Sequence, residues 1–274
     1  MLKHRLLYGG TLLTLFLGIV SLDFRSGGAT GTSILIAVFS LTALFEYYDI
    51  TRRVNRPSMP LLGLGAAALL LGVKLSGLVA VPAAALLAVV MTGLVFAVTL
   101  ASRGSFEERL ECVLLTVFGF SYVTVPTSFF LDVLALPGPP TGLRLFLWSI
   151  LVVKFTDTAA YFVGTKFGRT KLSSLSPNKS WEGAVGGTVA AVALAGALAG
   201  PALAVDGSRL VEFLLLATVL SVVGQAGDLV ESAVKRGFGV KDSGRWLPGI
   251  GGILDSIDSL IPIGPFLIAV AALS

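Results

Sequence analysis

The amino-acid sequence predicts an all-α, polytopic integral membrane protein with about nine transmembrane helices. Of its 274 residues, 55% are hydrophobic and only 13% are charged. Apolar runs of about 20 residues, the length of a helix that crosses a bilayer, recur from one end of the chain to the other. Short loops separate these runs. The composition and the spacing of the runs therefore favour a membrane protein over a soluble domain.

The predicted spans follow one another along the whole chain. They lie at about residues 6–22, 30–46, 59–74, 78–100, 110–130, 143–163, 183–204, 210–227 and 252–272. The first span begins after Lys3 and Arg5, as a signal sequence does. No small-residue cleavage site follows it, so we expect this segment to be retained as a helix. A turn on the outer face is expected at Pro137 to Pro140, between the fifth and sixth spans.

The chain divides into two regions of different character. Residues 1–150 hold spans with few polar groups at depth, which predicts a transmembrane scaffold that is open to oligomer contacts. From Lys154 onward, polar residues and glycines enter the ends of the spans. Residues 151–274 therefore predict a catalytic region, with cytoplasmic loops at 164–182 and 228–251.

The distribution of basic residues predicts the orientation in the membrane. The N-terminus and the even-numbered loops hold 15 of the 20 lysines and arginines, and the odd-numbered loops and their edges hold four. Without the sixth and eighth loops, which functional needs can also make basic, the bias keeps its sign at 7 against 4. Cytoplasmic loops carry the excess of positive charge. We therefore expect a cytoplasmic N-terminus, an external C-terminus and a site facing the cytoplasm, as in a bacterial inner membrane.

Several classes of function are disfavoured by composition. Cys112 is the only cysteine and lies in an apolar run, so neither a disulfide framework nor a thiolate metal cluster is expected. His4 is the only histidine and lies near the N-terminus, which excludes histidine–zinc sites and histidine acid–base chemistry. The net charge of +4 comes from short loops between spans, which suits anionic lipid and gives no reason to expect nucleic acid as a partner.

A first group of polar residues lies in the sixth span. Lys154, Asp157, Thr158 and Tyr161 recur at helical spacing and are expected to share one helix face. One interpretation is a buried Lys–Asp pair that holds helices together. The other is a polar stripe that lines a cavity, which we favour because further charges lie close downstream.

The loop before the seventh span combines hydroxyl groups with bases. Ser180 is expected to cap the helix, with Glu182 in its first turn. Capping leaves Arg169, Lys171 and Lys179 unexplained. Bases beside a helix N-terminus form a natural anion site, and a merely solvated loop is the alternative. The small residues that follow, from Gly183 to Ala191, predict close helix packing without a ligand, and they also allow a homodimer.

The segment around the eighth loop gathers carboxylates and bases. Asp228, Glu231, Ser232 and Lys235 are expected on one face at the end of the eighth span, where Glu231 and Lys235 have the spacing of an ion pair. Asp255 and Asp258, three residues apart, are expected on one face at the entry to the ninth. Two carboxylates at so short a distance repel each other, and binding of a divalent cation is the simplest way to neutralise them. With bases that suit phosphate, the segment predicts metal-assisted phosphate chemistry at a membrane surface.

Residues 232–258 resemble the signature of the phosphatidate cytidylyltransferase family, the CDP-diacylglycerol synthases. The matching positions are Ser232, Lys235, Arg236, Lys241, Asp242, Gly244, Leu247, Pro248, Gly251, Gly252, Asp255 and Asp258. Upstream blocks are similar as well: Asp157 to Gly164, Ser176 to Lys179 with Glu182 and Gly183, and Gly227 with Asp228. The resemblance covers roughly residues 154–260, nearly the C-terminal half of the chain.

The resemblance implies transfer of CMP from CTP to phosphatidic acid, giving CDP-diacylglycerol and pyrophosphate, with Mg²⁺ as cofactor and room for a second cation, monovalent or divalent. Our hypothesis places the metal on Asp228 and Asp255, with Asp258 and Glu231 as additional ligands. The other catalytic residues expected are Lys235, Arg236 and Lys241. The substrate-binding residues expected are Ser176, Asn178, Lys179, Asp157, Tyr161, Glu182, Ser232 and Asp242.

Two other functions stay open at this stage. One is transfer from CTP to a different lipid, such as a polyprenol or an archaeal-type lipid, which would share the nucleotide site. The other is a secondary transporter, because transporters also place ionisable residues and broken helices within the membrane. The chain has no evident inverted repeat, and its charges gather at span ends, which disfavours the transporter.

Two positions depart from the family signature and generate a prediction. Ile250 stands where the family usually has His, and Ser256 stands where it has Arg. The arginine would adjoin Asp255 and is suited to bind phosphate or to tether that carboxylate. The double variant Ile250→His, Ser256→Arg is therefore expected to raise the rate at which labelled CTP and phosphatidic acid are converted. An unchanged rate would mean that these two positions do not limit turnover.

Overall fold

The computed structural model describes residues 2–77, 83–136, 141–203, 209–244 and 251–273. The described residues are helical apart from loops and one isolated antiparallel bridge between Lys171 and Ser180. The helices up to residue 134 are α1 (Leu2–Ser26), α2 (Thr30–Arg53), α3 (Pro60–Ser76), α4 (Ala83–Ala101), α5 (Phe106–Gly119), the π-helical turn η1 (Phe120–Thr124) and α6 (Val125–Leu134). The later ones are α7 (Thr141–Phe167), α8 (Trp181–Leu203), α9 (Leu210–Gly237), α10 (Ile253–Ile257), the 3-10 helix η3 (Ile261–Ile263) and α11 (Gly264–Leu273).

The predicted all-α membrane class is confirmed. Among the described residues, five helical stretches are long and apolar enough to cross a membrane: Thr30–Arg53, Phe106–Leu134, Gly142–Phe167, Trp181–Gly200 and Leu210–Gly237. Two shorter apolar helices lie at Pro60–Ser76 and Ala85–Ala101. The number of nine spans stays a prediction.

The chain forms two compact units. The first contains residues 1–132 and 238–256, and the second contains residues 133–237 and 257–274. Residues 238–256, which follow α9, thus belong to the first unit, although segments of the second unit precede and follow them in sequence. The predicted division near residue 150 concerned scaffold and catalytic roles, and it stays a prediction.

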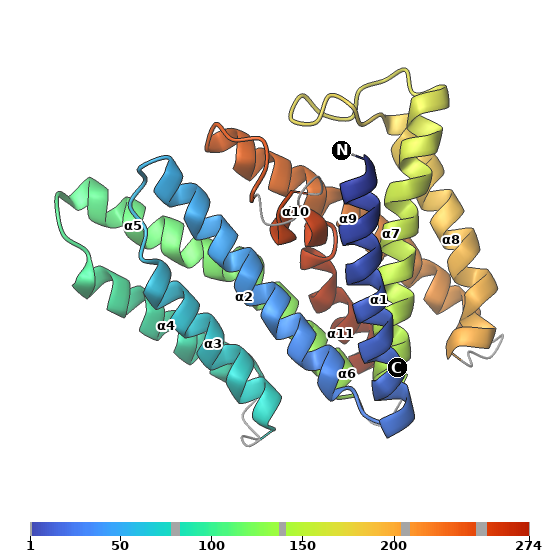
Figure 1. Cartoon of the computed structure of the whole chain (residues 1–274), viewed down its shortest axis with the longest axis horizontal. Helices are drawn as coiled ribbons and strands as arrows, with labels where there is room; N and C mark the ends of the chain where they lie inside the picture. The colour runs from blue at the N-terminus through green and yellow to red at the C-terminus, as the bar shows by residue number, and fades with distance from the viewer. Residues whose placement is uncertain (1, 78–82, 137–140, 204–208, 245–250, 274) are drawn as a thin grey trace. The chain divides into compact units, whose positions relative to one another are not determined.

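Helix α2 is the centre of the first unit. It packs against α1, α3, α5 and η1, and Figure 1 shows α2 to α5 running alongside one another. Its Tyr47 and Tyr48 are almost fully buried. Their hydroxyl groups donate to the carbonyl oxygens of Leu115 (3.1 Å) and Thr116 (2.7 Å), as buried tyrosines require. These two bonds fix α2 against α5.

In the second unit, α7 and α8 make the most extensive contact and run side by side (Figure 1). The cause is the small-residue face predicted for the seventh span. A Cβ atom at Gly187 would lie 2.7 Å from the Ala160 Cβ and 2.8 Å from the Thr156 carbonyl oxygen, closer than such atoms approach. The prediction of close packing through small residues is therefore confirmed for this helix pair.

A chain of polar side chains joins α7, α8 and α9. The Thr156 hydroxyl lies 3.0 Å from that of Ser221, which lies 2.9 Å from the Thr188 hydroxyl. The Gln225 amide donates to the Thr188 hydroxyl as well, at 3.0 Å. Hydrogen bonds between helices stabilise packing where the surroundings are apolar. This chain fixes the rotation of α9, the helix that carries several of the predicted site residues.

Two segments differ in detail from the predicted spans. Helix α9 continues to Gly237, ten residues beyond the predicted span end at 227, as the helix face predicted for Asp228 to Lys235 requires, so residues 228–237 of the predicted loop are helical. The continuous helix expected over 252–272 is interrupted, since a turn at residues 258–260 separates α10 from η3. Pro262 lies in η3 and cannot donate a backbone hydrogen bond, which favours this break. Asp255 and Asp258 therefore do not lie on one uninterrupted helix.

The α7–α8 contact predicts that even a methyl group at Gly187 destabilises the protein. Gly187→Ala is expected to lower the free energy of unfolding by about 1 to 3 kcal/mol, because the new atom overlaps α7. Gly200→Ala is the control, since a Cβ at Gly200 of the same helix meets no atom within 4 Å. Thermal unfolding in detergent measures both. A Gly187→Ala midpoint equal to or above that of Gly200→Ala would contradict the packing argument.

Candidate functional site

Three carboxylates converge in the second unit. Asp228 and Glu231 lie three residues apart on α9, and Asp258 comes from the turn after α10. One carboxylate oxygen from each lies within 4.8 Å of the other two. Glu231 is buried, and Asp228 and Asp258 are half-buried. A cluster of this kind has the donor type that hard divalent cations prefer.

Gly227 explains how α9 comes so close to the turn. A Cβ atom at this position would lie 2.7 Å from the Asp258 carbonyl oxygen and 2.7 Å from the Pro262 Cγ atom. Any larger residue would push α9 away from the turn and separate Asp228 from Asp258. Gly227 thus allows the close approach that brings the next residue, Asp228, beside Asp258.

Two lysines neutralise part of the cluster. The Lys179 ammonium lies 2.5 Å from Asp228, and the Lys235 ammonium lies 2.6 Å from Glu231. The latter is the i, i+4 ion pair that the sequence spacing allowed. Asp258 lies in the turn after α10, where it faces the Asp228 carboxylate. Its carboxylate accepts the Ser259 backbone N–H at 2.6 Å.

Ser259 connects the cluster to the polar residues of α7. The Lys154 ammonium donates to the Ser259 hydroxyl at 2.9 Å, and that hydroxyl donates to Asp157 at 3.0 Å. Lys154 and Asp157 themselves lie 3.9 Å apart. The Lys–Asp pair that the sequence left as the alternative interpretation is therefore present, and Ser259, the residue after Asp258, connects it to the carboxylate cluster. Tyr161 does not join it, because its side chain is 67% exposed and packs on Phe162.

The loop between α7 and α8 is held at both ends. The Leu172 N–H donates to the Lys179 carbonyl at 2.9 Å, and the Trp181 N–H donates to that of Thr170 at 3.0 Å. This pairing places Lys179 beside Asp228. The Lys179 N–H in turn donates to the Ser176 carbonyl at 3.1 Å. Ser176 is half-buried and Asn178 is exposed, and their substrate-binding roles stay predictions.

Ser180 and Glu182 stabilise the start of α8. The Ser180 hydroxyl accepts the Gly183 N–H at 3.1 Å, which confirms the predicted cap. The Glu182 carboxylate accepts the N–H groups of Arg169 and Thr170, both at 3.1 Å. Glu182 thus ties the loop back to α8. Its predicted role in binding substrate stays a prediction.

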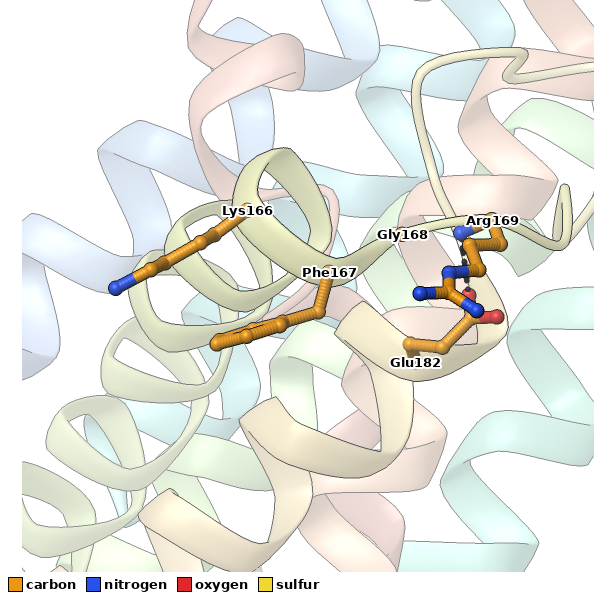
Figure 2. Close-up of a pocket in the computed structure, with 5 residues that line it drawn as sticks. All are labelled: Lys166, Phe167, Gly168, Arg169 and Glu182. Atoms are coloured by element: carbon orange, nitrogen blue, oxygen red, sulfur yellow. Dashed lines mark hydrogen bonds between the residues drawn. The ribbon is translucent and has the colours of Figure 1, made fainter.

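A pocket of about 600 Å³ opens at the end of α7. Its lining comprises Lys166, Phe167, Gly168, Arg169 and Glu182. Figure 2 shows Arg169 and Glu182 next to each other, while the Lys166 side chain extends away from them. The anion site predicted from Arg169, Lys171 and Lys179 stays a prediction, because only Arg169 of these bases lines the pocket and the Glu182 carboxylate lines it as well.

The remaining α9 residues continue the same helix beyond the cluster. Ser232 is half-buried and Arg236 is exposed, one on each side of Lys235 in the last turns of α9. Their positions are compatible with contact to an anionic substrate, and these roles stay predictions.

The other predicted residues lie in the first unit. The Asp255 carboxylate accepts the Ser243 N–H (3.0 Å), the Ser243 hydroxyl (2.9 Å) and the Gly252 N–H (2.9 Å). Lys241 and Asp242 are exposed. Because Asp255 and Asp228 belong to different units, their pairing around one metal stays a prediction.

Of the two positions that depart from the signature, the structure describes only Ser256. Ile250 lies outside the described residues. The Ser256 hydroxyl donates to the Gly252 carbonyl at 2.9 Å, one helical turn earlier. Ser256 thus contacts the residue whose N–H binds Asp255.

Reasoning from the sequence missed two residues of this region. Ser259 forms hydrogen bonds with both Lys154 and Asp157. Nothing in the sequence around Ser259 indicated this contact. Glu46 is a buried carboxylate at the predicted end of the second span. A charge at the edge of an apolar run was the available signal, since such charges need partners.

Comparisons with known proteins agree with the resemblance. The cytidylyltransferase family matches residues 3–274. A phosphatidate cytidylyltransferase of Brucella suis is 49% identical over 129 residues, which is 47% of each chain. The proteins of the same name from Bacillus subtilis and Staphylococcus haemolyticus are 47% identical over 133 residues and 40% identical over 171 residues. These matches cover 48% and 61% of this chain, and 49% and 60% of those relatives.

The chain thus spans about half the length of the first of these curated relatives. The family match, in contrast, extends over nearly the whole chain and includes both the carboxylate cluster of the second unit and the signature segment of the first. This chain belongs to the cytidylyltransferase family.

Proposed function

We propose that this protein is a phosphatidate cytidylyltransferase, which transfers CMP from CTP to phosphatidic acid and releases pyrophosphate. The observation that carries the proposal is the convergence of Asp228, Glu231 and Asp258 within 4.8 Å, beside Lys179 and Lys235. A site that must bring two polyanions together needs such a combination of carboxylates and bases. The names of the relatives supply the acceptor and the nucleotide.

The donor set fits Mg²⁺. Mg²⁺ is a hard cation that prefers oxygen ligands, and carboxylates are its usual protein ligands. Asp228, Glu231 and Asp258 would hold the ion, and Asp255 is proposed as a further ligand. A bound Mg²⁺ supplies positive charge that offsets the triphosphate. A second cation, monovalent or divalent, is part of the same proposal.

The reaction needs little acid–base help from the protein. A phosphate monoester has a second pKa of about 6, so phosphatidate is already largely dianionic at neutral pH. One of its phosphate oxygens bonds to the α-phosphorus of CTP, while the bond from that phosphorus to the oxygen bridging to the β-phosphate breaks. Pyrophosphate leaves with the electron pair. The absence of a suitable histidine from the sequence therefore poses no difficulty.

The bases around the cluster are proposed to bind the phosphates. Lys179 and Lys235 stand at its edge, where they contact Asp228 and Glu231. Arg236 and Lys241 are exposed and carry positive charge on the same stretch of sequence. Their main effect is to reduce the repulsion between the two anionic substrates as they meet.

The membrane setting completes the proposal. Phosphatidate would enter from the inner leaflet with its acyl chains left in lipid, and CTP would arrive from the cytosol. This requires the N-terminus on the cytoplasmic side of a bacterial inner membrane, as the positive charges predict. A homodimer stays part of the expectation. The family match gives no support to the transporter alternative.

The first test is an activity assay with matched variants. Purified protein in detergent, supplied with labelled CTP, Mg²⁺ and phosphatidic acid, is expected to form labelled CDP-diacylglycerol. Asp228→Asn and Asp255→Asn should each lower the rate by about a hundredfold or more, since metal ligands are lost. Glu212→Gln is the control, because this exposed residue of α9 pairs only with Arg209 in the contacts described.

Near-normal rates in either aspartate variant would refute the metal assignment. Labelled product formed from a polyprenol or an archaeal-type lipid, and none from phosphatidic acid, would replace the proposed acceptor.

The second test measures the cation directly. Mn²⁺ substitutes for Mg²⁺ at oxygen sites, and free Mn²⁺ is counted by electron paramagnetic resonance. Asp258→Asn is expected to weaken Mn²⁺ binding by about tenfold or more, because a charged ligand is replaced by a neutral one. Glu212→Gln should bind Mn²⁺ like the unmodified protein. Equal affinities for Asp258→Asn and Glu212→Gln would remove Asp258 from the cation site.

A further inference from the structure

Glu46 contacts the signature segment from the middle of the first unit. Its side chain is buried in α2 and its carboxylate accepts the backbone N–H groups of Ile253 (2.9 Å) and Leu254 (2.8 Å). The Ser243 hydroxyl lies 3.2 Å from the same carboxylate. All three donors come from residues 243–254, which lie 197 to 208 positions after Glu46 in the sequence.

The segment that Glu46 holds is the segment that binds Asp255. The Ser243 hydroxyl lies 3.2 Å from Glu46 and 2.9 Å from Asp255, so its single proton is shared between two carboxylates. The Ser243 and Gly252 N–H groups donate to Asp255 as well. Ile253 and Leu254, the two residues immediately before Asp255, are fixed by Glu46. The position of Asp255 therefore depends on Glu46 through both sides of the segment.

Two glycines of the signature make room for this carboxylate. A Cβ atom at Gly244 would lie 2.6 Å from a Glu46 oxygen, and one at Gly252 would overlap both the Glu46 carboxylate and the Ser243 hydroxyl. The segment is thus shaped around Glu46.

A carboxylate suits this position better than an amide. The two oxygens of Glu46 face three donors, and a carboxylate only accepts hydrogen bonds. A glutamine would present an NH₂ group to at least one of these N–H or O–H donors and leave it unsatisfied. Burying a charge here is costly unless such donors meet it. The number and kind of contacts are therefore specific to glutamate.

We propose that Glu46 is a positioning residue for Asp255: it binds the signature segment and sets the place of the Asp255 carboxylate without touching substrate. This inference rests on the proposed function, in which Asp255 is a metal ligand. Removal of a residue that orients a metal ligand typically lowers the metal affinity by about 10- to 100-fold.

The test compares two buried carboxylates of the first unit. Glu46→Gln is expected to weaken Mn²⁺ binding by about 10- to 100-fold, measured by electron paramagnetic resonance. Asp23→Asn is the matched control. Asp23 is also buried and also accepts two backbone N–H groups, those of Gly31 (2.9 Å) and Thr32 (2.6 Å), but it lies on α1 and binds the start of α2. Asp23→Asn should lower the unfolding temperature and leave the Mn²⁺ affinity unchanged.

Hydrogen exchange supplies a second readout that does not depend on metal or turnover. In Glu46→Gln the amides of Ile253 and Leu254 should exchange faster than in the unmodified protein, and in Asp23→Asn they should not. Glu46→Asp, which keeps the charge on a shorter side chain, should recover part of the Mn²⁺ affinity. If Glu46→Gln does not fold, Glu46→Asp alone decides: weaker Mn²⁺ binding with faster exchange supports the proposal, and unchanged values overturn it.

Asp255→Asn separates the two levels of the argument. If Asp255→Asn loses Mn²⁺ affinity while Glu46→Gln keeps it, the positioning role is overturned and the proposed metal site stands. If Asp255→Asn binds Mn²⁺ as tightly as the unmodified protein, the metal assignment and the role of Glu46 both fall. Equal loss of affinity in Glu46→Gln and Asp23→Asn would reduce Glu46 to a general contributor to stability.

Discussion

The structure depends on one constraint: a charged side chain among apolar helices needs a partner, because the surroundings offer little water to solvate it. In the first unit, Lys74 meets Asp132 at 2.6 Å, and Glu46 meets backbone N–H groups. In the second, Lys179 meets Asp228. Each of these pairings joins segments distant in sequence. These charged residues therefore help to determine which segments of the chain pack against one another.

The same constraint shows why much of the fold was predictable from sequence. Apolar runs long enough to span a bilayer appear as such in the chain, and the helices α3, α7 and α8 begin and end within a few residues of the prediction. Hydropathy placed the end of the eighth span at 227, and only the helical spacing of the polar residues after Gly227 indicated that the helix continues. The turn before Pro262 was not predicted, because hydropathy averaged over a window does not register a short turn inside an apolar run.

The candidate site was predictable to the extent that its contacts are local. Glu231 and Lys235 lie one helical turn apart, and their ion pair follows from spacing alone. Asp258 was a candidate because it stood near other carboxylates in sequence. The contacts of Ser259 and Glu46 span about a hundred and about two hundred residues. Helical periodicity does not predict contacts between residues so far apart in sequence. The sequence alone therefore shows only that Glu46 is a charged residue that needs a partner.

These contacts show two kinds of position in and just before the family signature. Asp258 of the signature and the preceding Asp228 and Glu231 present oxygens to one another and are suited to chemistry. Gly244 and Gly252 instead accommodate Glu46, so their small size follows from a carboxylate outside the signature. Some positions of the signature therefore serve to hold the segment in place, and not to contact substrate. Residues that build an active site need not touch the substrate, and here a glutamate of α2 meets that description through the backbone that it binds.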